Sequence, residues 1–324
     1  MFVNQTSINM LTVLHRFSFL ILLLCMSCCA SIKEHNTQDA PLLQDLKTLS
    51  SDEYQGRKTG TPGAEKAKDY IVERFKDLGI LAFPSYADYL QSFRFSTKNG
   101  EEMNGKNVIG YIPGKLKEAL VISAHYDHLG VIDGEIFNGA DDNASGVAGL
   151  LHIAAYFSKN KPNFTLIFAA FDAEEQGLKG AKYFVDNAPL DLSSIKLNVN
   201  MDMIAHNDKD ELYVCGTYHY PQLKQYILHD QPKLKIIPGH DDPKDEHNDW
   251  TDQSDQGAFH AKGIPFLYFG VEDHKDYHKA TDSYENINND FYVNAVDGIL
   301  GIIKNVDDKL SSQIQLDKNK VMKQ

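Results

Sequence analysis

Histidine and carboxylate side chains stand at five junctions between the strands and loops that the sequence predicts. They lie in the segments 125–128, 138–143, 172–175, 201–203 and 277–282. In open α/β sheets, ligands bind beyond the carboxyl ends of the strands, so we expect the five segments to meet at one edge of a sheet. Burying these groups without partners would cost much free energy, and a cationic centre is the simplest partner for them.

Each segment alone has an ordinary structural explanation. A histidine at the end of a strand is usually a hydrogen-bonded structural residue, and an aspartate pair before a helix usually caps that helix. A pair of glutamates after a strand commonly begins a solvated helix. Because all five segments are expected at one edge, we favour a metal site over five separate structural roles.

The number of candidate ligands indicates two metal ions. One catalytic zinc takes three protein ligands and keeps one position open, whereas two histidines and three carboxylates are available here. Two ions that share one bridging aspartate would each have one histidine and one further carboxylate. The remaining positive charge would be neutralised by a bridging hydroxide. Such a pair lowers the pKa of water and polarises a carbonyl group, and a further carboxylate must then accept the proton.

The elements that position these residues alternate between strands and helices. Apolar runs predict strands at 107–112, 119–124, 165–171, 197–204, 212–215 and 265–270. Apolar periodicity and capping residues predict helices at 62–79, 144–158, 178–186, 221–229, 254–262 and 291–310. This alternation predicts one α/β domain, with a central, mostly parallel mixed sheet and helices on both faces. The segment 232–255 is the one long polar insertion.

Composition and charge exclude several classes of protein. The chain has 324 residues, of which 42% are hydrophobic and 24% are charged, an ordinary globular profile. Its 32 basic and 45 acidic residues give a net charge of −13. Nucleic acid is therefore not expected as a partner, because binding phosphates requires a cationic face.

The N-terminal segment has the features of a secretory signal. Residues 1–27 contain Arg16 and no Asp or Glu, and Phe17 begins a short apolar run. Ser27 precedes Cys28, as in the bacterial lipobox, and Cys29 is a second candidate for acylation. We expect a lipoprotein-type signal peptide at 1–27, a polar tether at 28–40 and a tail at 311–324, with a plain signal peptide or an uncleaved anchor as alternatives. The expected location is the bacterial cell envelope, on its periplasmic or surface side, with membrane contact only through the tether.

The ordered motifs resemble those of the co-catalytic zinc exopeptidases of the bacterial leucyl-aminopeptidase type. The resemblance covers about residues 42–305 and rests on the five segments above and on two supporting stretches, Leu49–Gly63 and Asn107–Gly114. It implies a zinc exopeptidase fold of the phosphorylase/hydrolase type and a dizinc peptidase domain at 41–310.

The resemblance also implies a role for each candidate site residue. His125 and Asp202 would bind one zinc, Glu175 and His278 the other, and Asp142 would bridge the two ions. Glu174 would be the general base, and Asp127 would accept the second N–H of the His125 ring. Tyr277 would donate a hydrogen bond to the oxyanion, with simple packing as the alternative. Asp141 is the alternative bridge.

Two features depart from the family pattern. Gln256 stands where relatives often have histidine, which puts the geometry of the substrate pocket in question. The acidic stretch 238–250 is expected to be a solvated loop, with a calcium site or an acidic rim near the pocket as alternatives. Trp250 could form a pocket wall or only hold that loop together.

The expected function is an aminopeptidase that hydrolyses N-terminal residues from peptides with two Zn²⁺ ions, a bridging hydroxide and a Glu base. Mn²⁺ or Co²⁺ could replace zinc. The alternatives are a one-zinc glutaminyl cyclase, a carboxypeptidase or dipeptidase, and a binding protein without catalysis. Motifs for serine hydrolases, His-Glu-x-x-His metalloproteases and nucleotide-binding loops are absent from the sequence. Side-chain specificity and oligomeric state are not encoded in a visible pattern.

Overall fold

The computed structural model describes residues 39–321 apart from 228–231 and 246–247. The expected signal peptide and nearly all of the expected tether lie outside the described residues. The chain divides into the units Met1–Ala40 and Pro41–Gln324, and the second unit contains the α/β fold. Within the part that the structure describes, no helix has the length and apolarity needed to cross a membrane.

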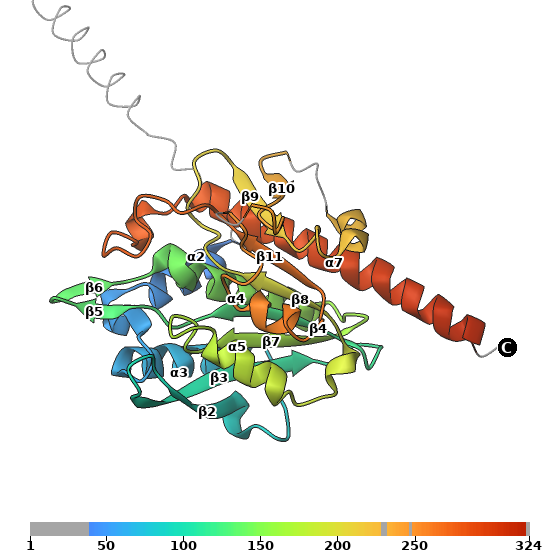
Figure 1. The fold of residues 1–324 in the computed structure, drawn as a ribbon, viewed down its shortest axis with the longest axis horizontal. Helices are drawn as coiled ribbons and strands as arrows, with labels where there is room; N and C mark the ends of the chain where they lie inside the picture. The colour runs from blue at the N-terminus through green and yellow to red at the C-terminus, as the bar shows by residue number, and fades with distance from the viewer. Residues whose placement is uncertain (1–38, 228–231, 246–247, 322–324) are drawn as a thin grey trace, which may run out of the picture. The chain divides into compact units, whose positions relative to one another are not determined.

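A nine-stranded mixed sheet forms the centre of this fold (Figure 1). Its order is β1-β3-β7-β4-β8-β11-β9-β10, and β2 also pairs with β3. The strands are β1 (Leu81–Ala82), β2 (Leu90–Ser96), β3 (Glu102–Ile112), β4 (Ala119–His125), β7 (Thr165–Phe171), β8 (Ile195–Met201), β9 (Glu211–Cys215), β10 (Lys235–Pro238) and β11 (Phe266–Gly270). The neighbours β7, β4, β8 and β11 are parallel, while β1, β2, β3 and β9 make antiparallel pairs. The predicted mixed sheet is confirmed, with parallel pairing at its centre. A separate hairpin joins β5 (Gly130–Ile132) and β6 (Glu135–Phe137).

Helices cover both faces of the sheet. They are α2 (Ala40–Leu49), α3 (Pro62–Asp77), α4 (Gly146–Lys159), α5 (Lys179–Asp186), α6 (Gln256–His260) and α7 (Asn289–Val321). The apolar sides of α2, α3, α4 and α7 share one core cluster, whereas α5 and α6 belong to a second cluster. The single α/β domain predicted from the sequence is therefore confirmed.

The central strands show why the chain needs helices on both sides. In β4, Leu120 and Ile122 join the first core cluster, while Ala119 and Val121 join the second. All four are fully buried. Side chains of a strand alternate between the two faces, so a continuous apolar run buries both of them.

Three expectations differ from the structure. The helix expected at 221–229 is wrong: a short 3₁₀ turn, η6 (Pro221–Tyr226), ends where Ile227 becomes extended and buried. The closing helix continues to Val321, so residues 311–321 are helical rather than a tail. Ser311 is buried and Ile314 packs against the first core cluster, which extends the helix beyond Leu310. Strands β1, β2 and β10 were not expected, because short or alternating edge strands give a weak apolar signal.

Replacing Gly146 by alanine is expected to destabilise the protein by about 1–3 kcal/mol, because a tightly packed site cannot accept an added carbon. A Cβ at Gly146, the first residue of α4, would lie 2.4 Å from the Met201 carbonyl oxygen. Thermal unfolding of Gly146→Ala beside Gly239→Ala checks this, since Gly239 has no atom within 4 Å of an added Cβ. Equal midpoints for the two variants would contradict the close approach of α4 to β8.

Candidate metal centre

The parallel strands deliver their C-terminal residues to one edge of the sheet. His125 is the last residue of β4 and pairs in register with Phe171 at the end of β7. Asp202 directly follows β8. The distorted helical turn η4 (Ala140–Ser145) leads into α4 and carries Asp142. The sequence prediction that these segments meet at one edge therefore agrees with the structure.

One group of donors contains His125, Asp142 and Asp202. The Nε2 atom of His125 lies 3.2 Å from an Asp202 carboxylate oxygen and 3.5 Å from Oδ1 of Asp142. One ligand atom from each of the three residues can be chosen so that all lie within 4.8 Å of one another. The three residues are all buried. They were all predicted as ligands, and the structure brings them together.

A second group of donors surrounds the other side of Asp142. The Nε2 atom of His278 lies 3.1 Å from Oδ2 of Asp142 and 3.8 Å from Glu175. His128, which the sequence reasoning did not assign, places its Nδ1 3.0 Å from Glu175 and 3.7 Å from Oδ2 of Asp142. The sequence offered one indication of this role, because His128 lies in the same strand-end segment, 125–128, as His125.

The structure distinguishes Asp142 from its neighbour Asp141. The two carboxylate oxygens of Asp142 face different histidines, His125 and His278, as a shared ligand requires. Asp141 instead points away, accepting hydrogen bonds from the Ala205 N–H and lying 3.1 Å from His274. The geometry therefore favours Asp142 over Asp141 as the shared residue.

Two carboxylates hold the backbone of the ligand segments. Asp282 accepts the N–H groups of both Asp141 and Asp142, at 2.9 and 3.0 Å. Asp127 accepts the N–H groups of Glu174 and Glu175, at 3.0 and 3.3 Å. The expected bond from His125 to the Asp127 carboxylate is corrected: the His125 Nδ1 lies 3.1 Å from the Asp127 backbone oxygen and 3.7 Å from its carboxylate.

Arg57 connects the segments that carry the candidate ligands through hydrogen bonds to their backbone. Its guanidinium is buried and donates to the carbonyl oxygens of Leu49, Tyr126, Asn138 and Gly139, at 2.6–2.8 Å. Burial lowers the pKa of Arg57 to about 10, against the opposing effect of Asp142 and Asp282. Arg57 lies in a stretch that matched the family pattern, but its role was not visible in the sequence.

The carboxylates of the centre repel one another in a buried space. Burial raises the pKa of Glu175 to about 7, and it raises the pKa of Glu174 well above its usual range, with Asp202 and Asp255 adding to the effect. Among the described residues, no Lys or Arg forms an ion pair with Asp142, Glu174, Glu175 or Asp202. The Nε2 atom of buried His128 also has no hydrogen-bond partner there. This donor set fits divalent metal ions, which supply the missing positive charge.

The backbone at the centre is strained. Ala173, Met203 and His278 have φ angles of 58°, 58° and 52°, in a region that side chains other than Gly rarely adopt. Each is a candidate ligand or adjoins a candidate site residue. Strain of this kind persists where the surroundings impose it and is common at functional sites.

Tyr277 lies beside the centre and is half-buried. Its ring stacks on His278 with the centroids 3.9 Å apart and also packs against the main core cluster. Burial raises the pKa of the Tyr277 hydroxyl, and the charges of Asp142 and Asp202 raise it further. The hydroxyl therefore stays protonated and is a hydrogen-bond donor.

The acidic insertion is anchored to the sheet. Buried Asp241 accepts the N–H groups of Gly216 and Tyr218. Trp250 stacks on His240, with the ring centroids 3.7 Å apart. The expectation of a simple solvated loop is therefore incomplete. Of the candidate ligand groups among the described residues, none lies in this insertion.

Gln256 has a structural role at this position. Its side-chain oxygen accepts from Asn200 of β8, and its amide donates to the Trp250 carbonyl. Gln256 thus ties the insertion to the sheet beside the centre. Neighbouring Asp255 is fully buried, its carboxylate oxygens have no hydrogen-bond partner among the described residues, and burial raises its pKa to about 8.

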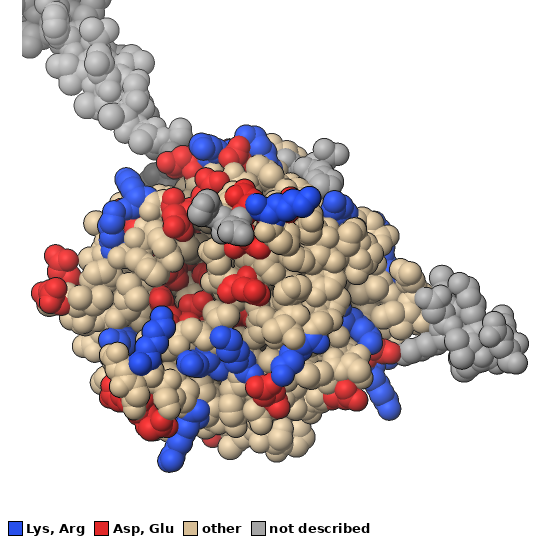
Figure 2. Space-filling view, viewed as in Figure 1, with Lys and Arg blue, Asp and Glu red and all other residues tan. Residues whose placement is uncertain are grey.

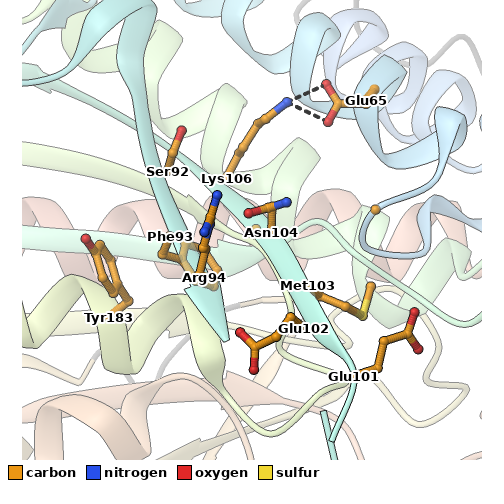
Figure 3. A pocket seen from close by; sticks show the side chains of 12 residues that line it. Glu65, Ser92, Phe93, Arg94, Glu101, Glu102, Met103, Asn104, Lys106 and Tyr183 are labelled. Atoms are coloured by element: carbon orange, nitrogen blue, oxygen red, sulfur yellow. Dashed lines mark hydrogen bonds and ion pairs between the residues drawn. The ribbon is translucent and has the colours of Figure 1, made fainter. Parts of the chain in front are cut away.

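Acidic side chains gather in a hollow near the middle of one face, where Figure 1 labels α4 (Figure 2). A separate pocket of about 870 Å³ lies along β2 and β3, where Lys106 pairs with Glu65 at 2.7 Å (Figure 3). None of the predicted site residues lines this pocket. The donor set, rather than the size of a cavity, identifies the candidate metal centre.

The metal-free protein is expected to lose stability as the pH rises from about 5 to 8. Burial raises the pKa of Asp172 to about 7 and that of Asp255 to about 8. The folded chain then holds protons that the unfolded chain has released, since an unfolded Asp titrates near about 3.9. The free energy of unfolding therefore falls with rising pH. Thermal unfolding in a chelator at several pH values measures this slope, which Asp255→Asn should reduce. A midpoint that rises over this range would contradict it.

Comparison with known protein sequences identifies related proteins. Residues 107–303 match the family model of Peptidase family M28. The chain is 27% identical over 192 residues to the alkaline phosphatase isozyme conversion protein of Escherichia coli K12, covering 55% of this chain and 54% of that protein. It is 27% identical over 288 residues to leupeptin-inactivating enzyme 1 of Streptomyces exfoliatus, covering 80% and 57%. The chain thus spans a little over half the length of these curated relatives.

Solved structures share the fold at low sequence identity. A zinc aminopeptidase from Bacillus subtilis has a TM-score of 0.67 at 16% identity, covering 84% of this chain and 96% of that one. A glutaminyl cyclase from Porphyromonas gingivalis has a TM-score of 0.66 at 16% identity, covering 82% and 96%. These two likenesses concern the fold alone. Because the family model matches more than half of its residues, the chain belongs to peptidase family M28.

Proposed function

We propose that this chain is a metal-dependent aminopeptidase that removes N-terminal residues from peptides. The observation that carries the proposal is the position of Asp142 between two donor groups, with one carboxylate oxygen toward His125 and the other toward His278. This arrangement suits two adjacent ions, zinc in the first place, with Mn²⁺ or Co²⁺ as substitutes. Membership of a peptidase family supports peptides as the substrate class.

Some residues of the centre would bind the metal ions, and others would transfer protons. His125 and Asp202 would hold one ion, Glu175 and His278 the other, and Asp142 both, with His128 beside the second. When bound, the two ions would polarise the scissile carbonyl and lower the pKa of water.

Glu174 is the proposed general base, because the family resemblance gives it that role and its carboxylate lies close enough to His125 and Asp202 to interact with their charges. It takes the proton from the attacking water and passes it to the leaving amine. Asp127 positions Glu174 through the backbone, and the protonated hydroxyl of Tyr277 would donate to the carbonyl oxygen of the substrate.

Hydrolysis of aminoacyl-p-nitroanilides tests the proposal. The zinc-loaded protein should release p-nitroaniline from substrates with a free α-amino group and not from the same substrates with an acetylated amine. Elemental analysis should find at least two zinc ions per chain, and Asp142→Asn should reduce that number. Equal rates on free and blocked substrates would exclude an aminopeptidase.

A glutaminyl cyclase on the same fold is the second candidate, because one such enzyme shares the architecture. This reaction is an intramolecular acyl transfer that releases ammonia from an N-terminal glutamine. Ammonia release from a glutaminyl peptide, together with a centre that holds a single ion, would favour it. Cleavage from the C-terminus or of dipeptides alone would favour a carboxypeptidase or dipeptidase, and a folded protein with neither metal nor activity would favour a binding role.

We also propose that the chain is exported and tethered by a lipid at Cys28 or Cys29. Incorporation of labelled palmitate into the full chain, and its loss when both cysteines are replaced by alanine, tests the tether. Labelling that survives the double replacement would exclude it.

A further inference from the structure

A separate cluster of potential ligands lies beyond the candidate metal centre. His206, His274 and Asp276 each offer one ligand atom, and these atoms lie within 4.8 Å of one another. His206 follows β8, whereas His274 and Asp276 lie in the loop after β11, so the fold brings together segments far apart in the sequence. We call these three residues the His206 cluster. None of them belongs to the five predicted ligands.

Two atoms of the His206 cluster are buried without hydrogen-bond partners among the described residues. They are Nδ1 of His206 and Oδ2 of Asp276. The two atoms face each other at 3.9 Å, too far for a hydrogen bond. Asp276 is only 6% exposed, and its other oxygen accepts the Thr281 hydroxyl at 2.7 Å. A buried carboxylate oxygen without a partner is costly, and a cation between the two atoms would remove that cost.

The third donor is oriented from outside the cluster. The Nε2 atom of His274 lies 3.1 Å from the Asp141 carboxylate, and donation of its proton there makes Nδ1 an acceptor on the cluster side. The Nδ1 lone pair accepts the Asp276 N–H at 3.2 Å, a hydrogen bond that a bound ion would replace. Histidines that bind metals commonly donate their other N–H to a carboxylate in this way. The rings of His206 and His274 stack, with centroids 3.8 Å apart.

The spacing of the donors suits a transition-metal ion. Zinc bonds of about 2.0–2.2 Å place tetrahedral ligand atoms about 3.4 Å apart, so His206 and Asp276 would close by about 0.5 Å. The donor pairs of the candidate metal centre lie 3.1–3.8 Å apart in the same structure, a similar spacing. The side chains of His206 and His274 are 11% and 9% exposed, which gives an ion access from solvent.

We propose that His206, His274 and Asp276 bind a further divalent transition-metal ion, zinc in the first place, separate from the candidate metal centre. Two histidines and one carboxylate form a typical three-ligand zinc set with one open position. The bound ion fixes the loop that also carries His278, and Asp141 links it to the backbone beside Asp142.

Zinc stoichiometry tests the proposal directly. The full chain is dialysed to equilibrium against Zn²⁺ and its metal content is measured by elemental analysis. His206→Ala should bind one zinc fewer per chain than the unchanged protein. His260→Ala, which removes a partly buried histidine from α6, should bind the same number as the unchanged protein. Equal zinc content in His206→Ala and the unchanged protein would overturn the proposal.

A second variant and a second measurement separate ligand loss from misfolding. Asp276→Asn removes the charge but keeps an oxygen for Thr281, and it should also lose one zinc while keeping the unchanged far-UV circular dichroism. Crystals soaked in zinc should show an anomalous peak between His206 and Asp276, and the absence of that peak would overturn the proposal. The peak should persist in Asp142→Asn, so the test does not depend on the proposed peptidase activity.

Discussion

Replacing Glu174 by glutamine is expected to lower kcat by about 10²–10⁴-fold, the usual contribution of a general base. The substitution keeps the shape of the side chain and removes its ability to accept a proton. The backbone N–H of Glu174 still donates to Asp127, so the chain should keep its position. Zinc content and the unfolding midpoint should therefore stay unchanged. Steady-state rates on aminoacyl-p-nitroanilides, with elemental analysis of the same samples, measure both effects.

Glu135→Gln is the matched control for this prediction. Glu135 is an exposed glutamate of β6, and its replacement makes the same chemical change away from the candidate metal centre. We expect its kcat to equal that of the unchanged protein. If Glu174→Gln retains kcat within threefold, Glu174 is not the base. If it loses zinc as well as activity, its side chain holds the metal instead.

Replacing Arg57 by methionine is expected to destabilise the protein by about 3–5 kcal/mol, since several buried carbonyl oxygens lose their donor at once. The guanidinium donates to four carbonyl groups from separate segments of the chain, those of Leu49, Tyr126, Asn138 and Gly139. Methionine fills a similar volume but donates no hydrogen bond. For a chain of this length the unfolding midpoint should fall by about 5–8 °C.

Arg94→Met is the control for Arg57→Met. Arg94 lies on β2 and is exposed, so its replacement should leave the midpoint nearly unchanged. Zinc affinity gives a further measure, because Arg57 joins the segment after His125 to the segment before Asp142. We expect weaker zinc binding in Arg57→Met and not in Arg94→Met. Equal stability of the two variants would mean that water replaces the guanidinium without cost.

Much of the architecture follows from local patterns. The strands β4 and β7 are mostly apolar runs with buried side chains on both faces, and such runs are recognised without tertiary information. The helix α3 has Pro62 at its start and the cap Thr61, whose side chain accepts from Ala64 N–H. The edge strand β2 has alternating burial and pairs with β3 across the short segment 97–101, so its sequence signal was alternation rather than a continuous apolar run.

The sequence predicted which residue types form the candidate site but not all of the contacts between them. The sequence placed His125, Asp142 and Asp202 at element ends, and the structure brings them together. It did not identify His128 as a donor or Arg57 as a support. His128 contacts Glu175, which is 47 residues away along the chain. A contact of that kind leaves no local pattern.

The sequence by itself determined which side chains stand at the strand ends, because strand periodicity and turn chemistry are local properties. The family resemblance already favoured Asp142 as the shared ligand, and only the tertiary structure shows the reason. Asp142 lies between the two histidines, whereas Asp141 turns toward His274, 133 residues away. Adjacent aspartates differ in direction according to how their turn packs, and that packing depends on the register and twist of the whole sheet.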